Sequence, residues 1–234
     1  PQNTIASKLG AMFINEWFLP SALVGARLEP LRYAFGATIV CRRETLQAIG
    51  GFEEIANHLA DDYMLGRMVH ERGLAVVLSP YVVENVVRER SLTALFFHEL
   101  RWARTFRTLR PFSYALSLLT HGIPLSLGLA LFGAGRLGPA AVIAHVGLRC
   151  LERVMVYRAL RKPLRWSEMW LVPVRDVLSF ALVVLSFMGR TVRWNDEQFR
   201  VRPDGRLERL VSRRGALEPP KDVVAIGAER EEPA

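Results

Sequence analysis

A long apolar stretch at residues 112–134 limits the ways in which this chain can fold. Only one side chain in it, that of His121, can carry a charge near neutral pH. As a single helix, a stretch of this length would cross a hydrocarbon core of about 30 Å. Gly122 and Pro124 lie within it, and both residue types are tolerated in membrane helices. We therefore predict a membrane-spanning helix over 112–134.

Two further apolar segments, 137–157 and 169–188, contain charged residues. These are Arg149, Glu152, Arg153, Arg175 and Asp176. Charges inside a membrane span are costly and usually face a cavity or a partner. Two interpretations stay open: two more membrane helices, or a short membrane hairpin followed by an interfacial helix. The adjacent residues Arg175 and Asp176 could form a structural ion pair or line a polar entrance for lipid.

The chain is basic, with 31 Lys+Arg residues against 23 Asp+Glu residues and a formal net charge of +8. Its arginines bracket the apolar segments, which favours an anionic membrane surface over nucleic acid as the partner. The positive-inside rule places residues 1–110, the loop at 158–167 and the basic tail at 190–234 in the cytoplasm. Three full crossings would put the tail outside, so we expect 169–188 to be re-entrant or interfacial.

The first 110 residues have the character of an α/β domain. Apolar side chains at helical spacing over 8–26 are typical of a core helix or of an interfacial amphipathic helix. We predict further helices over 43–48, 61–72 and 91–110, and strands over 33–40, 74–78 and 81–87. Such a domain is too short to close alone, and the chain begins without methionine, so we expect a C-terminal fragment. With only two cysteines, a reducing compartment fits.

The residues that could carry chemistry fall in two places. Asp61 and Asp62 begin a predicted helix, where acids often serve only as N-terminal caps. Before the first apolar stretch comes the run His98-Glu99-Leu100-Arg101-Trp102. A carboxylate can deprotonate an attacking hydroxyl, and a guanidinium can hold a leaving diphosphate. An indole offers a flat apolar wall to a sugar ring or a lipid. Together these groups suit glycosyl transfer to a lipid alcohol.

Residues 35–110 resemble the C-terminal half of the catalytic domain of GT-A glycosyltransferases, above all the ceramide glucosyltransferase-like family (type 2 and 21 enzymes). That family carries an (E/D)-D-Y motif and a (Q/R)-x-x-R-W motif ahead of C-terminal membrane helices. Here the motifs read Asp61-Asp62-Tyr63 and His98-Glu99-Leu100-Arg101-Trp102. The stretches LADDYMLG, LSPYVVENVV and HELRWART most resemble the bacterial hopanoid-biosynthesis branch. The resemblance covers about residues 33–202.

The resemblance implies the C-terminal half of a GT-A domain followed by two to three membrane helices in the bacterial inner membrane. It implies an inverting enzyme that transfers N-acetylglucosamine or glucose from a UDP-sugar to a lipid alcohol, hopanoid-like or ceramide-like. By the same match Asp62 is the general base, while His98, Arg101 and Trp102 bind the donor diphosphate or the acceptor. His98 departs from the Gln or Arg of the family and is not an equivalent donor.

Further residues are weaker candidates. Asp61 adjoins the base, and Gly36 could let the backbone approach the donor sugar or mark a plain β-bulge. Arg193 and Trp194 match the basic aromatic tail of the family. The chain contains no Asp-x-Asp motif. The resemblance implies a divalent cation, Mg²⁺ or Mn²⁺, that is bound mainly by a missing N-terminal half, with no metal ligand in this chain.

Two other functions remain open. A membrane-anchored interaction module would use its arginines to hold anionic lipid and its acids as helix caps, with no dependence on a UDP-sugar. A processive polysaccharide synthase of the same fold would need more membrane helices than this sequence supplies.

Overall fold

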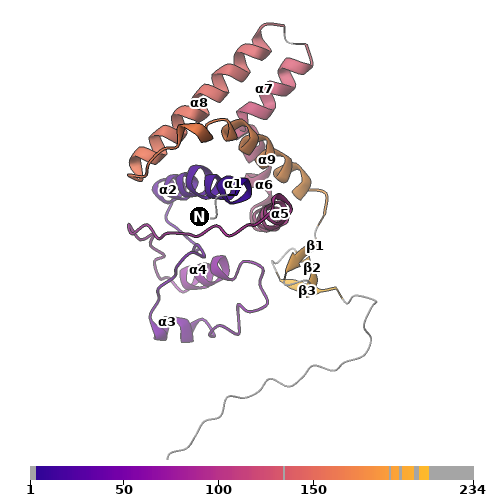
Figure 1. The fold of residues 1–234 in the computed structure, drawn as a ribbon. Helices are drawn as coiled ribbons and strands as arrows, with labels where there is room; N and C mark the ends of the chain where they lie inside the picture. Colours follow the sequence, from indigo (N-terminus) through magenta and orange to yellow (C-terminus); the bar gives the residue numbers. More distant parts are fainter. Residues whose placement is uncertain (1–3, 134, 190, 195–196, 203–205, 211–234) are drawn as a thin grey trace, which may run out of the picture.

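The computed structural model describes residues 4–133, 135–189, 191–194, 197–202 and 206–210. It is mainly helical, with one small antiparallel sheet (Figure 1). A hairpin formed by α7 (Gly122–Leu131) and α8 (Leu137–Ala159) projects from a central helical layer. That layer contains α1 (Ile5–Phe13), α2 (Leu19–Leu28), α5 (Leu92–Leu109) and α9 (Leu171–Ser186). On its other side lie α3 (Arg43–Ala48) and α4 (Asp61–Glu71).

The first helix is continuous from α1 through a π-helical turn, Ile14–Phe18, into α2. Its start is capped by Thr4, whose hydroxyl accepts a hydrogen bond from the Ser7 N–H. Leu9 and Met12 pack into a core cluster with residues of α5 and α9, whereas Leu23 near the other end is exposed. By length and composition, Ile5–Leu28 is the one unbent helix among the described residues that could cross a membrane. The predicted helix over 8–26 lies within it.

The predicted continuous helix over 112–134 is wrong. The structure has α6 (Pro111–Leu116), a 3₁₀ turn at Ser117–Thr120 and then α7, bent by 61° at the break. The backbone of His121 is not helical, with φ −87° and ψ 70°. Pro124 explains why, because its ring excludes a helical hydrogen bond to the carbonyl four residues earlier. Only if the two bent parts are counted as one span do they give a second candidate crossing.

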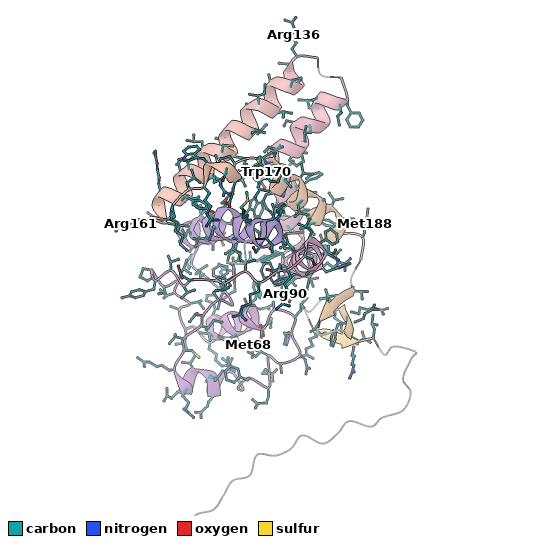
Figure 2. The ribbon with its side chains drawn as sticks, in the orientation of Figure 1. Met68, Arg90, Arg136, Arg161, Trp170 and Met188 are labelled. Carbon is teal, nitrogen blue, oxygen red and sulfur yellow. The ribbon has the colours of Figure 1, made fainter. Side chains whose placement is uncertain are left out.

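Helices α8 and α9 occupy the two other apolar segments. Arg136 lies at the tip of the α7–α8 hairpin and Arg161 lies just beyond the opposite end of α8 (Figure 2). Gly138 permits close packing of the hairpin, since a Cβ there would lie 2.4 Å from the Cα of Ala130. Neither α8 nor α9 is among the described helices that are long and apolar enough to cross a membrane: α9 has only 16 residues, and α8 carries Arg149, Glu152 and Arg153.

The strands predicted in the front half are wrong. Over 33–40, 74–78 and 81–87 the described backbone contains no strand, although α3, α4 and α5 fall where helices are predicted. A β-branched run favours a strand only where a partner strand supplies hydrogen bonds and cross-strand packing. Val77 is 82% exposed and Tyr81 is 85% exposed, so these runs lie largely outside the packed core, although Val76 and Val87 contact it.

The sheet comes from the region predicted only as a basic tail. Strands β1 (Thr191–Trp194), β2 (Glu197–Val201) and β3 (Leu207–Arg209) pair antiparallel in the order β1-β2-β3. In their register Thr191 faces Arg200, and Val201 faces Leu207. Residues 211–234 of the predicted tail lie outside the described residues.

The sheet is fastened to the loop that precedes α4. The Leu207 N–H donates to the Asn57 carbonyl at 2.9 Å, and Val192 and Val201 pack against Leu59. Leu59 lies only two residues before Asp61. The sheet therefore braces the turn that carries the acid pair.

Candidate functional site

The acid pair forms the first turn of α4. Asp61 Oδ1 accepts the Asp62 N–H at 2.9 Å, and Asp62 Oδ1 accepts the Tyr63 N–H at 2.8 Å. Both carboxylates thus satisfy backbone donors that a helix start leaves unpaired. The capping role considered for these residues is real. It leaves the second oxygen of Asp62, Oδ2, for other partners.

That second oxygen lies against Gly36. A Cβ at Gly36 would come within 2.8 Å of Asp62 Oδ2. The glycine is neither a β-bulge nor part of a strand, and it makes room for the Asp62 carboxylate. The segment at 33–36, which contains Gly36, can approach α4 only because residue 66 is a glycine: a Cβ there would lie 2.1 Å from the Ala34 backbone nitrogen. Two glycines therefore let the segment at 33–36 lie across the start of α4.

Aromatic side chains cover the same segment. Tyr33 stacks on Tyr63 with ring centroids 4.8 Å apart, and the Arg110 guanidinium lies 5.3 Å from the Tyr33 ring centroid. Phe35 meets Phe18 edge-on at 5.4 Å. These contacts fix the segment at 33–36, and with it the wall beside Asp62.

The half-buried Asp62 carboxyl has an altered pKa. Burial raises its pKa above the ordinary value of 3.8, and the neighbouring charge of Asp61 acts in the same direction. Hydrogen bonds from the backbone of Tyr63 and Gly36 oppose this rise. A raised pKa makes the carboxylate a better proton acceptor than an exposed aspartate.

The second motif lies on α5. Arg101 is half-buried; burial lowers its pKa, and the charge of Asp61 partly restores it. This interaction indicates that Arg101 of α5 lies within electrostatic range of Asp61 at the start of α4. Asp61 and Arg101 thus interact electrostatically although they lie forty residues apart in the sequence.

Trp102 and His98 pack together on α5, with ring centroids 4.3 Å apart. His98 Nδ1 lies 2.6 Å from Glu89 Oε1, so Glu89 orients the imidazole. Trp102 also stacks on Phe13 of α1 at 5.9 Å. Sequence reasoning missed Glu89 and Phe13 as neighbours of the motif. Phe13 was visible only as one of several apolar residues at helical spacing.

Arg175 and Asp176 have separate partners in the part of the chain that the structure describes. Arg175 pairs with Glu99, and Asp176 accepts from Arg149 at 3.0 Å. Both are 3% exposed. They are structural ion-pair residues, as one interpretation held, but each pairs with another helix. Their burial speaks against the alternative of a lipid entrance.

Other arginines near the site also act structurally. Arg104 donates to the Thr191 carbonyl, and Arg107 donates to the carbonyls of Ser186 and of Gly189, the latter at 2.7 Å. They tie α5 to the end of α9 and the start of β1. Arg193 and Trp194 belong to β1, and their side chains lie outside the described residues.

Within the described ranges, no group of three or more His, Cys, Asp or Glu side chains could hold a metal ion. Binding of Mg²⁺ or Mn²⁺ therefore stays a prediction. A groove of about 630 Å³ lies between the end of α2 and residues 73–78. Its lining includes Leu23, His70 and Val77, but none of the candidate site residues.

Residues 1–207 match the family described as "Glycosyl transferase family 21". The chain is 23% identical over 185 residues to "Ceramide glucosyltransferase 1" of Caenorhabditis elegans. That match covers 74% of this chain and 38% of the relative, so the chain spans well under half of the relative's length. No solved structure matches. Because the family match covers most of its length, the chain belongs to glycosyltransferase family 21.

Proposed function

We propose that this chain forms the acceptor-side part of an inverting lipid glycosyltransferase with a GT-A catalytic domain. It would transfer glucose or N-acetylglucosamine from a UDP-sugar to the hydroxyl of a ceramide-like or hopanoid-like lipid in a cell membrane, the bacterial inner membrane by the earlier resemblance. The observation that carries the proposal is the placement of Asp62. Its carboxylate is half-buried against Gly36 and has a raised pKa. The neighbouring carboxylate in the same turn, that of Asp61, interacts electrostatically with Arg101.

The reaction would be a single displacement. Asp62 removes the proton of the acceptor hydroxyl while its oxygen bonds to the anomeric carbon of the donor. The bond from that carbon to the diphosphate oxygen breaks, and UDP leaves with the electron pair. Attack opposite an α-linked leaving group yields a β-glycoside.

Arg101 would bind the leaving diphosphate of the donor, and Trp102 would contact the lipid acceptor. Negative charge builds on the leaving diphosphate, and the Arg101 guanidinium can donate two hydrogen bonds to it. The Trp102 indole offers an apolar face to the acceptor. His98, held by Glu89, could donate a further hydrogen bond. We assign no step to a divalent cation, because the described residues form no site for one.

A membrane location is supported by the apolar helix Ile5–Leu28. Trp17 and Phe18 lie in its π-helical turn, and Phe35 of the segment beside Asp62 contacts Phe18. The acid turn thus connects to the apolar helix through direct aromatic contacts. A lipid hydroxyl at the membrane surface would be within reach of such a turn.

The proposal is tested with the full gene product reconstituted in liposomes. Radiolabelled UDP-glucose and UDP-N-acetylglucosamine are supplied in turn, with a ceramide or a hopanoid alcohol as acceptor. We expect a labelled lipid from one donor, with a β-anomeric proton in its NMR spectrum.

Three results would contradict the proposal. Absence of transfer from both donors, together with salt-sensitive binding to anionic vesicles, would favour the interaction module. A product of α configuration would rule out the single displacement and the base role of Asp62. A polymer in place of a glycolipid would instead indicate a polysaccharide synthase.

A further inference from the structure

The interior of the helical layer contains an arginine whose donors all have partners. Arg175 of α9 is 3% exposed, and its two terminal nitrogens donate to Glu99 of α5 at 2.8 and 2.7 Å. Its Nε donates to the Ser179 hydroxyl at 3.0 Å, and Nη1 also reaches the Leu9 carbonyl at 3.3 Å. One guanidinium therefore joins three helices, α1, α5 and α9, which lie together in the central helical layer (Figure 1).

This pairing fixes the rotation of α5 about its own axis. Glu99 and Arg101 are two residues apart, or about 200° around a helix, and so point to opposite sides. Glu99 pairs with Arg175 of α9, while Arg101, on the opposite side of α5, interacts electrostatically with Asp61 of the acid turn. A bidentate pair restricts orientation as well as distance. Holding Glu99 against α9 therefore aims Arg101 at the turn that carries Asp62.

Arg175 is also connected to Trp102 indirectly, because both contact the Phe13 ring. The Arg175 guanidinium carbon lies 5.2 Å from the centroid of the Phe13 ring. Phe13 in turn stacks on Trp102 with an interplanar angle of 27°. Phe13 thus links the guanidinium to the indole. Glu99 and Trp102, three residues apart, share one face of α5.

We propose that Arg175 is a positioning residue that sets the orientation of Arg101 and Trp102 through Glu99 and Phe13. This inference rests on the proposed function, because it assigns those two side chains to the diphosphate and the acceptor. Arg175 itself is buried and touches neither substrate. Its substitution should disturb catalysis through the geometry of α5.

A second buried pair provides the matched control. Arg153 of α8 is 1% exposed and pairs with Glu16, which is 3% exposed, in the π-helical turn. Neither residue lies on α5. Replacing either arginine by lysine keeps the charge but loses the planar fork. Both variants should therefore lose similar thermal stability.

The experiment compares Arg175→Lys with Arg153→Lys in the full gene product, labelled with 5-fluorotryptophan. The chain has five tryptophans, and Trp102→Phe identifies the ¹⁹F resonance of Trp102. We expect Arg175→Lys to move that resonance and to lower kcat for sugar transfer at least tenfold. We expect Arg153→Lys to leave the resonance unchanged and to lower kcat less than twofold.

A third variant keeps the test decisive if either lysine variant fails to fold. Phe13→Leu leaves the Arg175–Glu99 pair in place and removes the ring that stacks on Trp102. It should move the Trp102 resonance and raise the acceptor KM severalfold, with the donor KM unchanged. An equal rise in both KM values would contradict the link through Phe13.

An unmoved Trp102 resonance in Arg175→Lys, or equal losses of kcat in the two lysine variants, would overturn the proposal. If the wild-type protein transfers no sugar, the proposed function fails. The resonance then still reports whether Arg175 orients Trp102, so the two failures are distinguishable.

Discussion

Replacing Gly36 by alanine tests directly how Asp62 is held. The added Cβ would lie 2.8 Å from Oδ2, 3.3 Å from Cγ and 3.4 Å from Cβ of Asp62. All three atoms belong to one side chain, which can rotate. The carboxylate must therefore retreat by about 0.6 Å to regain an ordinary van der Waals contact. The hydrogen bond from the Gly36 backbone should weaken at the same time.

The expected loss follows from this displacement. A misplacement of about 1 Å in a catalytic group can lower the rate about 100-fold. For about 0.6 Å, we expect kcat to fall roughly 10- to 100-fold. Because a side chain moves and not the backbone, the melting temperature should change by less than about 4 °C, equivalent to under about 1 kcal/mol.

The assay measures transfer of radiolabelled sugar to lipid at saturating donor and acceptor, with thermal unfolding of the same sample. Gly25→Ala is the matched control, because no atom lies within 4 Å of a Cβ built there. Gly25 is in α2, where alanine favours the helix by about 0.5–1 kcal/mol. It should keep wild-type kcat. A Gly36→Ala variant with wild-type kcat would refute the placement of Asp62.

Three further predictions concern the same site. Arg101→Ala should lower kcat about 10²–10³-fold, or about 3–4 kcal/mol, if the guanidinium stabilises the departing diphosphate; an unchanged rate in the transfer assay would exclude that contact. Gly66→Ala should cost at least about 1–3 kcal/mol in chemical denaturation, because its Cβ would collide with backbone atoms of Tyr33 and Ala34; wild-type stability would show that this packing is loose. Burial raises the pKa of Asp62, so the folded state keeps this proton to a higher pH than the unfolded state, and its contribution to stability falls as pH rises from about 3.8 through the raised value. The melting temperature of Asp62→Asn relative to wild type should therefore rise as the pH increases from about 3.8 through the raised pKa, and a constant difference in calorimetry would contradict the pKa direction.

Much of the helical framework could be predicted from the sequence. The acid pair at the start of α4 and the boundaries of α3 follow from local signals, namely capping residues, the glycines after α3 and apolar spacing. The order of the two motifs and the family resemblance predict that Asp62 and Arg101 belong to one site, and this assignment stays a prediction. In the structure the charge of Asp61, the neighbour of Asp62, acts on Arg101.

Other features depend on contacts that no local pattern contains. The runs at 74–78 and 81–87 have β-branched composition, yet strand formation requires a partner strand. The break at His121 reflects a proline that a continuous membrane helix could have accommodated by other means. Adjacency suggested that Arg175 pairs with Asp176, but neighbours on a helix face different directions, and each residue reaches another helix.

We infer that Asp62 deprotonates the lipid hydroxyl, whereas Asp61 only accepts a backbone hydrogen bond at the start of α4 and interacts electrostatically with Arg101. Transfer rates of Asp62→Asn and Asp61→Asn, measured side by side in the reconstituted full gene product, test it most directly. Asparagine can still cap a helix, so both variants should fold. Asp62→Asn should lose transfer almost completely, by about 10³-fold or more, whereas Asp61→Asn should keep most of it. Substantial turnover by Asp62→Asn, or an equal loss in both variants, would contradict the account.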